Sequence, residues 1–202
     1  LKELRHITKN KEKWNTIIDE VATYLNENHS DDVKAKVLWL LGEMGLSYPV
    51  KVKKYVVDIA KFLNDDCSKL RERSVNALGR VGRADKTLIV PYVDKIMEMR
   101  RDSVSDVRLD FVWACENIVT NAPELFCKKL DLFYEMIQDK GERVRIEAAE
   151  MFRVMGKRKP EYVKPYLEKL QWFVDNDVHP IVRIHSAGAI RITKRALKES
   201  DS

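Results

Sequence analysis

The residue types that perform catalysis are scattered along this sequence. Four histidines occur in 202 residues, and none has a second His or a Cys at the spacing that places two metal ligands on one helix face. The sequence contains no glycine-rich phosphate loop, no GxSxG elbow and no HExxH pair. Its many carboxylates are typical of solvated or Arg-paired positions rather than of acid–base catalysts. The sequence therefore predicts no catalytic residue, no metal site and no cofactor.

Large aromatic side chains suggest a different chemistry, that of binding a partner. Trp39 lies in a stretch that also carries Lys34 and Lys36, and Trp113 lies in one that carries Arg108 and Asn117. Their numbers differ by 74, which is twice 37 (113 − 39 = 74). This spacing indicates internal repeats of 37 residues, in which the two tryptophans would occupy equivalent positions.

The sequence repeats itself every 37 or 38 residues. Five segments align without gaps on one aliphatic residue each, spaced by 37, 37, 37 and 38 residues: Val33, Leu70, Val107, Val144 and Val182. A basic residue follows each of these anchor residues, and an Asn or Asp precedes each by five positions. Coincidence does not produce such a pattern, and a repeat of this length indicates stacked supersecondary units.

Each repeat is predicted to form two helices. Apolar or small residues recur four, seven, eight and eleven positions after each anchor, as the 3.6-residue period of a helix requires. An amphipathic first helix precedes each of them, for example over residues 14–25 and 52–63. Gly42 and Gly79 are expected at the C-terminal ends of second helices, where Gly commonly caps. A single helix pair cannot bury its apolar stripe, so neighbouring pairs must stack into an all-α, right-handed solenoid, or superhelix.

These units resemble HEAT repeats, and the segments LGRVG and IEAAEMF are also similar to the HEAT-like repeats of phycobilin lyases. In that family an Asp and an Arg six positions apart form ladders along the stack. The matching pairs here are Asp65–Arg71, Asp102–Arg108, Asp139–Arg145 and Asp177–Arg183. The first unit departs from the pattern, with Asn28 and Lys34. The resemblance implies a single domain, 1–202, of about five two-helix HEAT-like repeats, at residues 11–46, 47–83, 84–121, 122–157 and 158–197.

By resemblance to the family, the second helices line the concave face. Residues three, six and ten positions after each anchor would then point into that face. The predicted partner-binding residues at these positions are Trp39, Arg73, Asn76, Arg80, Asp110, Trp113 and Asn117. Exposed tryptophans often anchor partners. The alternative is that each Trp lies flat against the next repeat and extends the core, because Trp is usually mostly buried.

Three functions are compatible with this surface. The favoured one is a non-enzymatic scaffold or adaptor that binds a protein segment, and an acidic segment with two hydrophobic residues would suit Trp, Arg and Asn side chains. Nucleic-acid binding is the alternative, with basic helix ends on phosphates and tryptophans stacking on bases. The enzymatic version of that alternative is a resemblance to alkylpurine DNA glycosylases, which also use a HEAT-like solenoid with a Trp and a carboxylate. Asp110 and Trp113, one helical turn apart, would match that pair.

The composition limits the classes of partner and the cellular compartment that are expected. The net charge of +5 arises from 37 Lys and Arg against 32 Asp and Glu, and nucleic-acid binders usually concentrate more positive charge on one face. No stretch approaches the roughly 20 apolar residues of a membrane span, so no membrane association is expected. Three cysteines without a CxxC pair indicate a reducing, cytoplasmic environment.

Overall fold

The computed structural model describes residues 1–26 and 28–200. Glu27 of the first predicted repeat and residues 201–202 of the predicted domain lie outside this range. The described residues form helices and connecting turns, with no strand among them. They divide into two compact units, which we call unit 1 (Leu1–Asn117) and unit 2 (Ile118–Ser202). The assignment of residues 1–202 to one domain, with the repeat boundaries given above, stays a prediction.

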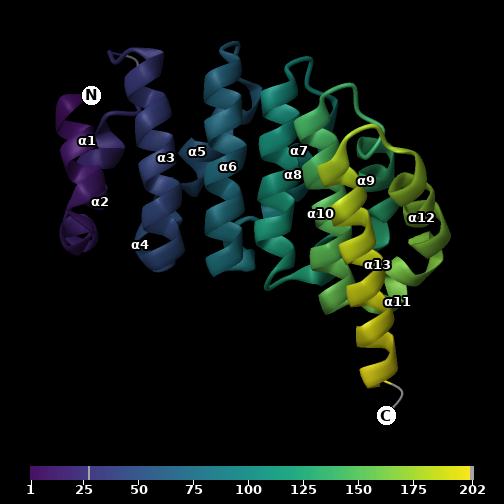
Figure 1. The fold of residues 1–202 in the computed structure, drawn as a ribbon. Coiled ribbons are helices and arrows are strands. Elements are labelled where there is room, and N and C mark those ends of the chain that lie inside the picture. Colours follow the sequence, from purple (N-terminus) through teal and green to yellow (C-terminus); the bar gives the residue numbers. More distant parts are fainter. Residues whose placement is uncertain (27, 201–202) are drawn as a thin grey trace. The chain divides into compact units, whose positions relative to one another are not determined.

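The α-helices follow one another in the order that the repeats predict. Unit 1 contains α1 (Lys2–Lys9), α2 (Trp14–Thr23), α3 (Asp31–Ser47), α4 (Pro49–Val52), α5 (Val56–Lys61), α6 (Ser68–Ala84), α7 (Val93–Glu98) and most of α8 (Ser105–Val119). Unit 2 contains α9 (Leu130–Met136), α10 (Glu142–Arg158), α11 (Pro160–Val163), α12 (Leu167–Asn176) and α13 (Pro180–Ser200). The second helices of unit 1, α3, α6 and α8, stand side by side in Figure 1.

The first helices are interrupted at equivalent positions. Four of them contain a 3₁₀ turn, at Lys53–Tyr55, Val90–Tyr92, Cys127–Lys129 and Lys164–Tyr166. Pro91 and Pro165 lie inside two of these turns. Proline has no N–H to give to the α-helical ladder, so a tighter turn at that point is expected. Pro180 instead begins α13, where the missing N–H costs no helical hydrogen bond.

The core follows the predicted register. Four of the five anchor residues are buried, and Val33 of the first repeat is the one that stays half-exposed. Val107, Ala114, Val144 and Ala148, which the repeat pattern places inside, are buried. None of the helices in the described part of the chain combines the length and apolarity needed to cross a membrane.

The glycines of the second helices have a different role from the one predicted. Gly42 and Gly79 lie inside α3 and α6 rather than at their ends, and both have ordinary helical backbone angles. A Cβ on Gly42 would lie 2.7 Å from the Cα of Ala77, and a Cβ on Gly79 would lie 2.5 Å from the Cα of Ala114. The missing side chains therefore allow α3 to approach α6 closely, and α6 to approach α8.

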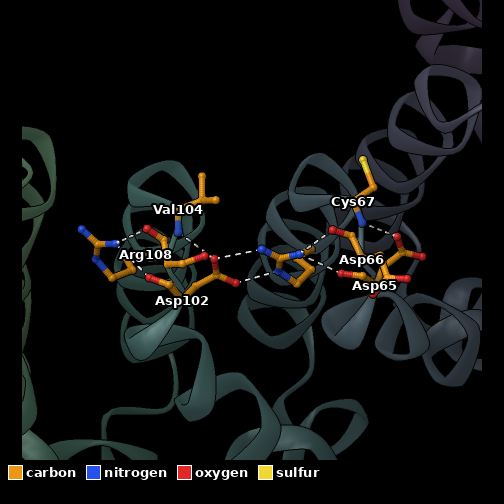
Figure 2. A network of polar contacts seen from close by, with 8 residues as sticks. Asp65, Asp66, Cys67, Asp102, Val104 and Arg108 are labelled. Atoms are coloured by element: carbon orange, nitrogen blue, oxygen red, sulfur yellow. Dashed lines mark hydrogen bonds and ion pairs between the residues drawn. The ribbon is translucent and has the colours of Figure 1, made fainter.

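A ladder of Asp and Arg side chains joins consecutive repeats (Figure 2). The Arg108 Nη1 donates to the backbone carbonyl of Asp102 at 2.8 Å, and the Arg145 Nη1 donates to that of Asp139 at 3.2 Å. The Asp102 carboxylate accepts the backbone N–H of Val104 at 2.9 Å and thereby caps the start of α8. Arg108 and Arg145 therefore contact the Asp residues or carbonyls that were predicted for them.

The ladder also crosses from one repeat to the next. In unit 1 the guanidinium of Arg71 forms two hydrogen bonds with the Asp102 carboxylate, at 2.6 and 3.0 Å. In unit 2 the Arg145 Nε lies 3.5 Å from the Asp177 carboxylate. Each Arg thus bonds the backbone of its own inter-helix turn and the carboxylate of the following repeat, which fixes the spacing between repeats.

Candidate partner-binding surface

The predicted site residues lie on the three second helices of unit 1. Trp39 is on α3, Asn76 is on α6 and Trp113 is on α8, each six positions after its anchor. The close approaches at Gly42 and Gly79 hold these helices in register, so equivalent positions lie beside one another. We call the residues three, six and ten positions after the anchors of these three helices the second-helix surface; it comprises Lys36, Trp39, Glu43, Arg73, Asn76, Arg80, Asp110, Trp113 and Asn117.

Both tryptophans of this surface are half-buried, and a cation covers each ring. The Lys36 Nζ lies 3.9 Å from the centroid of the Trp39 ring, one turn away on the same helix. The Arg80 Cζ lies 4.4 Å from the centroid of the Trp113 ring, across the contact between α6 and α8. Cation–π attraction of this kind holds a ring in place and leaves part of it accessible. Neither ring is fully buried in the core.

Arg80 connects all three second helices. Besides covering Trp113 on α8, its Nε forms an ion pair with the carboxylate of Glu43 on α3. Its side chain is only 13% exposed, and burial lowers the pKa of the guanidinium from its usual value. The Arg80 Nη1 has no hydrogen-bond partner among the described residues. Arg80 is thus a mostly buried cation whose charge is balanced by Glu43 and whose Nη1 donor is unused. It is not a free positive charge.

Asn76 and Asp110 form a second link between α6 and α8. The Asn76 Nδ2 donates to the Asp110 Oδ2 at 3.2 Å, and the Asn76 side chain is buried. Burial, followed by repulsion from Glu72, raises the pKa of Asp110 to about 6. The Asn76 Oδ1 has no partner among the described residues. This pair therefore places an unused acceptor and a weakly acidic carboxyl beside the Trp113 and Arg80 stack.

The remaining predicted residues, Asn117 and Arg73, differ in their exposure to solvent. Asn117 is buried, accepts from the Arg83 Nη1 at 3.2 Å and donates to the Trp113 carbonyl at 3.0 Å. Arg73 is half-exposed, and its Nη2 lies 3.1 Å from the Glu72 carboxylate. Arg73 is consequently more accessible than Arg80, while Asn117 mainly supports the Trp113 turn.

Two members of this surface were absent from the predicted set. Glu43 neutralises Arg80, and Lys36 covers Trp39. Both occupy the same repeat positions, ten and three residues after the anchor, as residues that were chosen. Pairing of equal positions on adjacent helices was the signal that could have found Glu43. Among the described residues, no group of three or more His, Cys, Asp or Glu side chains is arranged to hold a metal ion.

The sequence matches no protein-family model and no curated protein. Its fold is similar to that of a designed armadillo repeat protein in complex with the peptide (KR)4, with a TM-score of 0.71, 17% identity, and coverage of 94% of this chain and 91% of that one. A chain in a model of the full-length AP-3 complex gives a TM-score of 0.74 at 16% identity, over 94% of this chain and 33% of that one. An engineered protein gives 0.66 at 16%, over 89% and 80%.

These similarities concern the fold. They show that the chain is an all-α helical-repeat solenoid of the HEAT and armadillo type, which confirms the predicted fold class and the resemblance drawn from the repeats. The right-handed sense of the predicted superhelix stays a prediction.

Proposed function

We propose that this protein is a non-enzymatic scaffold or adaptor that binds a protein segment along the second-helix surface of unit 1. A surface that binds proteins is what the helical-repeat fold and its peptide-bound neighbour support. We further propose that this surface is the concave face, and that the protein acts in the cytoplasm, where its three unpaired cysteines would remain reduced.

The observation that carries the proposal is the pair of half-buried tryptophans at equivalent positions two repeats apart. Adjacent packed helices lie about 8–10 Å apart, so two intervals separate the rings by about 20 Å. An extended peptide covers that distance in about six residues. Two hydrophobic side chains of one segment can therefore contact Trp39 and Trp113 together, and aromatic anchors of this kind supply most of the affinity in many interfaces.

The charges near Trp39 favour an acidic segment. Burial lowers the pKa of Lys36, and the proximity of Arg5 and Arg73 lowers it further. Three cations therefore share one region, whereas Arg80 is already paired with Glu43. A carboxylate of the partner would relieve the repulsion among Arg5, Lys36 and Arg73 while its apolar neighbours bind the rings.

A direct test uses a fluorescent peptide rich in Asp and Glu, with two leucines about six residues apart. The variant Trp39→Ala/Trp113→Ala should weaken binding by about thirty-fold or more, because both anchors are lost. Trp172→Ala is the matched control, since Trp172 is an exposed Trp on α12 of unit 2. Circular dichroism should show the same helicity in all three proteins.

Two results would overturn this function. Unchanged peptide affinity in the double variant would remove the tryptophans from the binding surface. Release of bases from alkylated DNA that Asp110→Asn abolishes would instead establish the glycosylase alternative, in which Asp110 and Trp113 act on a nucleotide.

A further inference from the structure

A second surface of interest lies on α13 of unit 2, apart from the second-helix surface of unit 1. One side of this helix packs on α10, where Gly156 lies directly against Thr193. Another side borders an open hollow of about 480 Å³ between α12 and α13. The hollow is lined by Gln171, Ala187, Ile190, Arg191, Lys194, Arg195 and Lys198. Four of these seven residues are cationic.

The repeat pattern shows that this composition is unusual. Twelve positions after the anchor, the other repeats carry a small or apolar buried residue: Gly45, Gly82, Val119 and Gly156. The equivalent residue of α13 is Lys194, which is exposed. Nine positions after the anchor, α3 and α6 carry the close-packing glycines, α8 carries Glu116, and α13 carries Arg191, as α10 carries Arg153. Close packing of an apolar helix on this side of α13 would bury two cations without partners, at considerable cost.

The four cations form one stripe along α13. Their spacing of three, four and seven residues places them on a single helix face about 10 Å long. Arg195 contacts Glu199 at 3.7 Å, and both of these side chains are well exposed, so this pair is weak. Arg191 and Lys194 form no ion pair in the part of the chain that the structure describes. Arg191 and Lys194, at the centre of the face, therefore keep their positive charge unpaired among the described residues, whereas Arg195 and Lys198 have other contacts.

The same face becomes apolar towards the start of α13. Ile184 is 66% exposed, and Ala187, one turn further on, is also exposed. Ile184, Ala187, Arg191 and Lys194 follow one another at helical spacing, so they form one continuous face. In two other repeats the residue equivalent to Ile184 is buried, as Ala35 and Leu109. Ile184 is therefore more exposed than the apolar residues at the same position of the other repeats.

We propose that this α13 face binds a helix of a partner protein that is acidic in its N-terminal half and apolar in its C-terminal half. Charge complementarity with the four cations selects the acidic half, and contact with Ile184 and Ala187 selects the apolar half. The partner helix runs antiparallel to α13. In that orientation its acids lie in its own first turns, where the helix dipole favours them, and they meet the cations in the last turns of α13.

The alternative ligands for a basic face are nucleic acids and anionic membranes. Both would be bound by charge alone and would need no apolar contact at a fixed distance from the cations. The ordered change along α13 from apolar to basic side chains is what favours an amphipathic helix over these two.

The test uses a synthetic helical peptide of that design, with a scrambled peptide of equal composition beside it. Arg191→Glu/Lys194→Glu should weaken binding by about ten-fold or more, and a peptide with Lys in place of its Glu residues should bind this variant better than the original protein. Lys157→Glu/Arg158→Glu, two exposed cations at the end of α10, is the matched control and should bind normally. Ile184→Asp tests the apolar half and should also weaken binding.

The outcomes separate cleanly. Equal affinity for the scrambled peptide, or normal binding by the Arg191→Glu/Lys194→Glu variant, would overturn the proposal. Tighter binding of duplex DNA or of phosphatidylserine vesicles than of the designed peptide, lost in the same variant, would also overturn it in favour of that ligand. Binding at α13 should be unaffected by Trp39→Ala/Trp113→Ala, so this test stands independently of the function proposed for unit 1.

Discussion

The second helices of the two units place different side chains at equivalent positions. Six residues after the anchor, unit 1 has Trp39, Asn76 and Trp113, whereas unit 2 has Glu150 and Gly188. In unit 1 the polar side chains bond from helix to helix, as Arg80 does with Glu43 and Asn76 with Asp110. In unit 2, Glu150 pairs with Arg153 of its own helix and lies 3.6 Å from the His185 ring.

What the units share lies inside them or in the turns between helices. Both have buried anchors, Asp carboxylates that accept a backbone N–H just before a second helix, and an Arg that reaches the next Asp. These contacts define the repeat, and they leave the outer positions of the second helices free to carry different surfaces. The comparison indicates that the fold depends on a few repeated positions, and that binding depends on the others.

The largest effect should come from the ladder, and it should differ between the units. Asp102 is 7% exposed in its side chain, accepts two hydrogen bonds from Arg71 and caps α8. Asp102→Ala should lower the free energy of unfolding by about 4 kcal/mol, because it removes the carboxylate that accepts from the half-buried Arg71 guanidinium and from the Val104 N–H. Asp177→Ala in unit 2 should cost about 2 kcal/mol, since Arg145 lies further away, at 3.5 Å. Urea unfolding at neutral pH measures both, and equal losses would show that the two ladders are equivalent.

The ladder should also give unit 1 a dependence on acid. Burial alone would raise the pKa of Asp102, but hydrogen bonds from Arg71 and from the Val104 N–H outweigh burial and lower the pKa. A lowered pKa in the folded state stabilises the protein above the pKa of the unfolded chain, about 4, and this stabilisation is lost as the pH falls below it. The Asp102→Ala variant should therefore lose less stability than the original protein when the pH is lowered from 5 to 3.

The next effect concerns the close approach of helices. A Cβ on Gly79 would lie 2.5 Å from a backbone atom of α8, so Gly79→Ala forces α6 and α8 apart and should cost about 3 kcal/mol. A Cβ on Gly188 would lie 3.4 Å from the Cδ of the flexible Arg153 side chain. Gly188→Ala should therefore be neutral or stabilise by up to about 1 kcal/mol, as Ala does in a helix. Thermal unfolding of both variants checks this, and a neutral Gly79→Ala would refute the tight contact.

The repeats, the helix pairs and the buried register could be predicted because they depend on residues that recur every 37 or 38 positions. The place of Gly42 and Gly79 could not, because the same residue serves as a cap or as a contact, and only the neighbouring helix decides which. The contacts of Arg80 could not be predicted either. Its charge was visible in the sequence, but its pairing with Glu43 and its position over Trp113 depend on distances between helices. The sequence therefore identified the helices that carry the surface but overestimated its free positive charge.

The sharpest probe of the unit 1 surface is the titration of Asp110. Burial, with Glu72 nearby, raises the pKa of Asp110 from 3.8 to about 6. An acid whose pKa is higher in the folded state keeps its proton there while the unfolded chain has already released one. Its contribution to stability is therefore complete below about pH 4 and is lost as the pH rises through 6.

The expected size of that loss is about 2 kcal/mol, less than the full shift implies because water partly screens the site. Asp110→Asn removes the titration and keeps an oxygen that can accept from Asn76, so it should be more stable than the original protein at pH 7.5 and similar at pH 4. Asp94→Asn on the exposed side of α7 is the control and should follow the original protein throughout. Denaturant unfolding at pH steps from 4 to 7.5 measures the three curves. If the Asp110→Asn curve stays parallel to the other two, Asp110 is not held in a desolvated site. The polar contact between α6 and α8 would then be as accessible to solvent as the Glu150–Arg153 pair of unit 2.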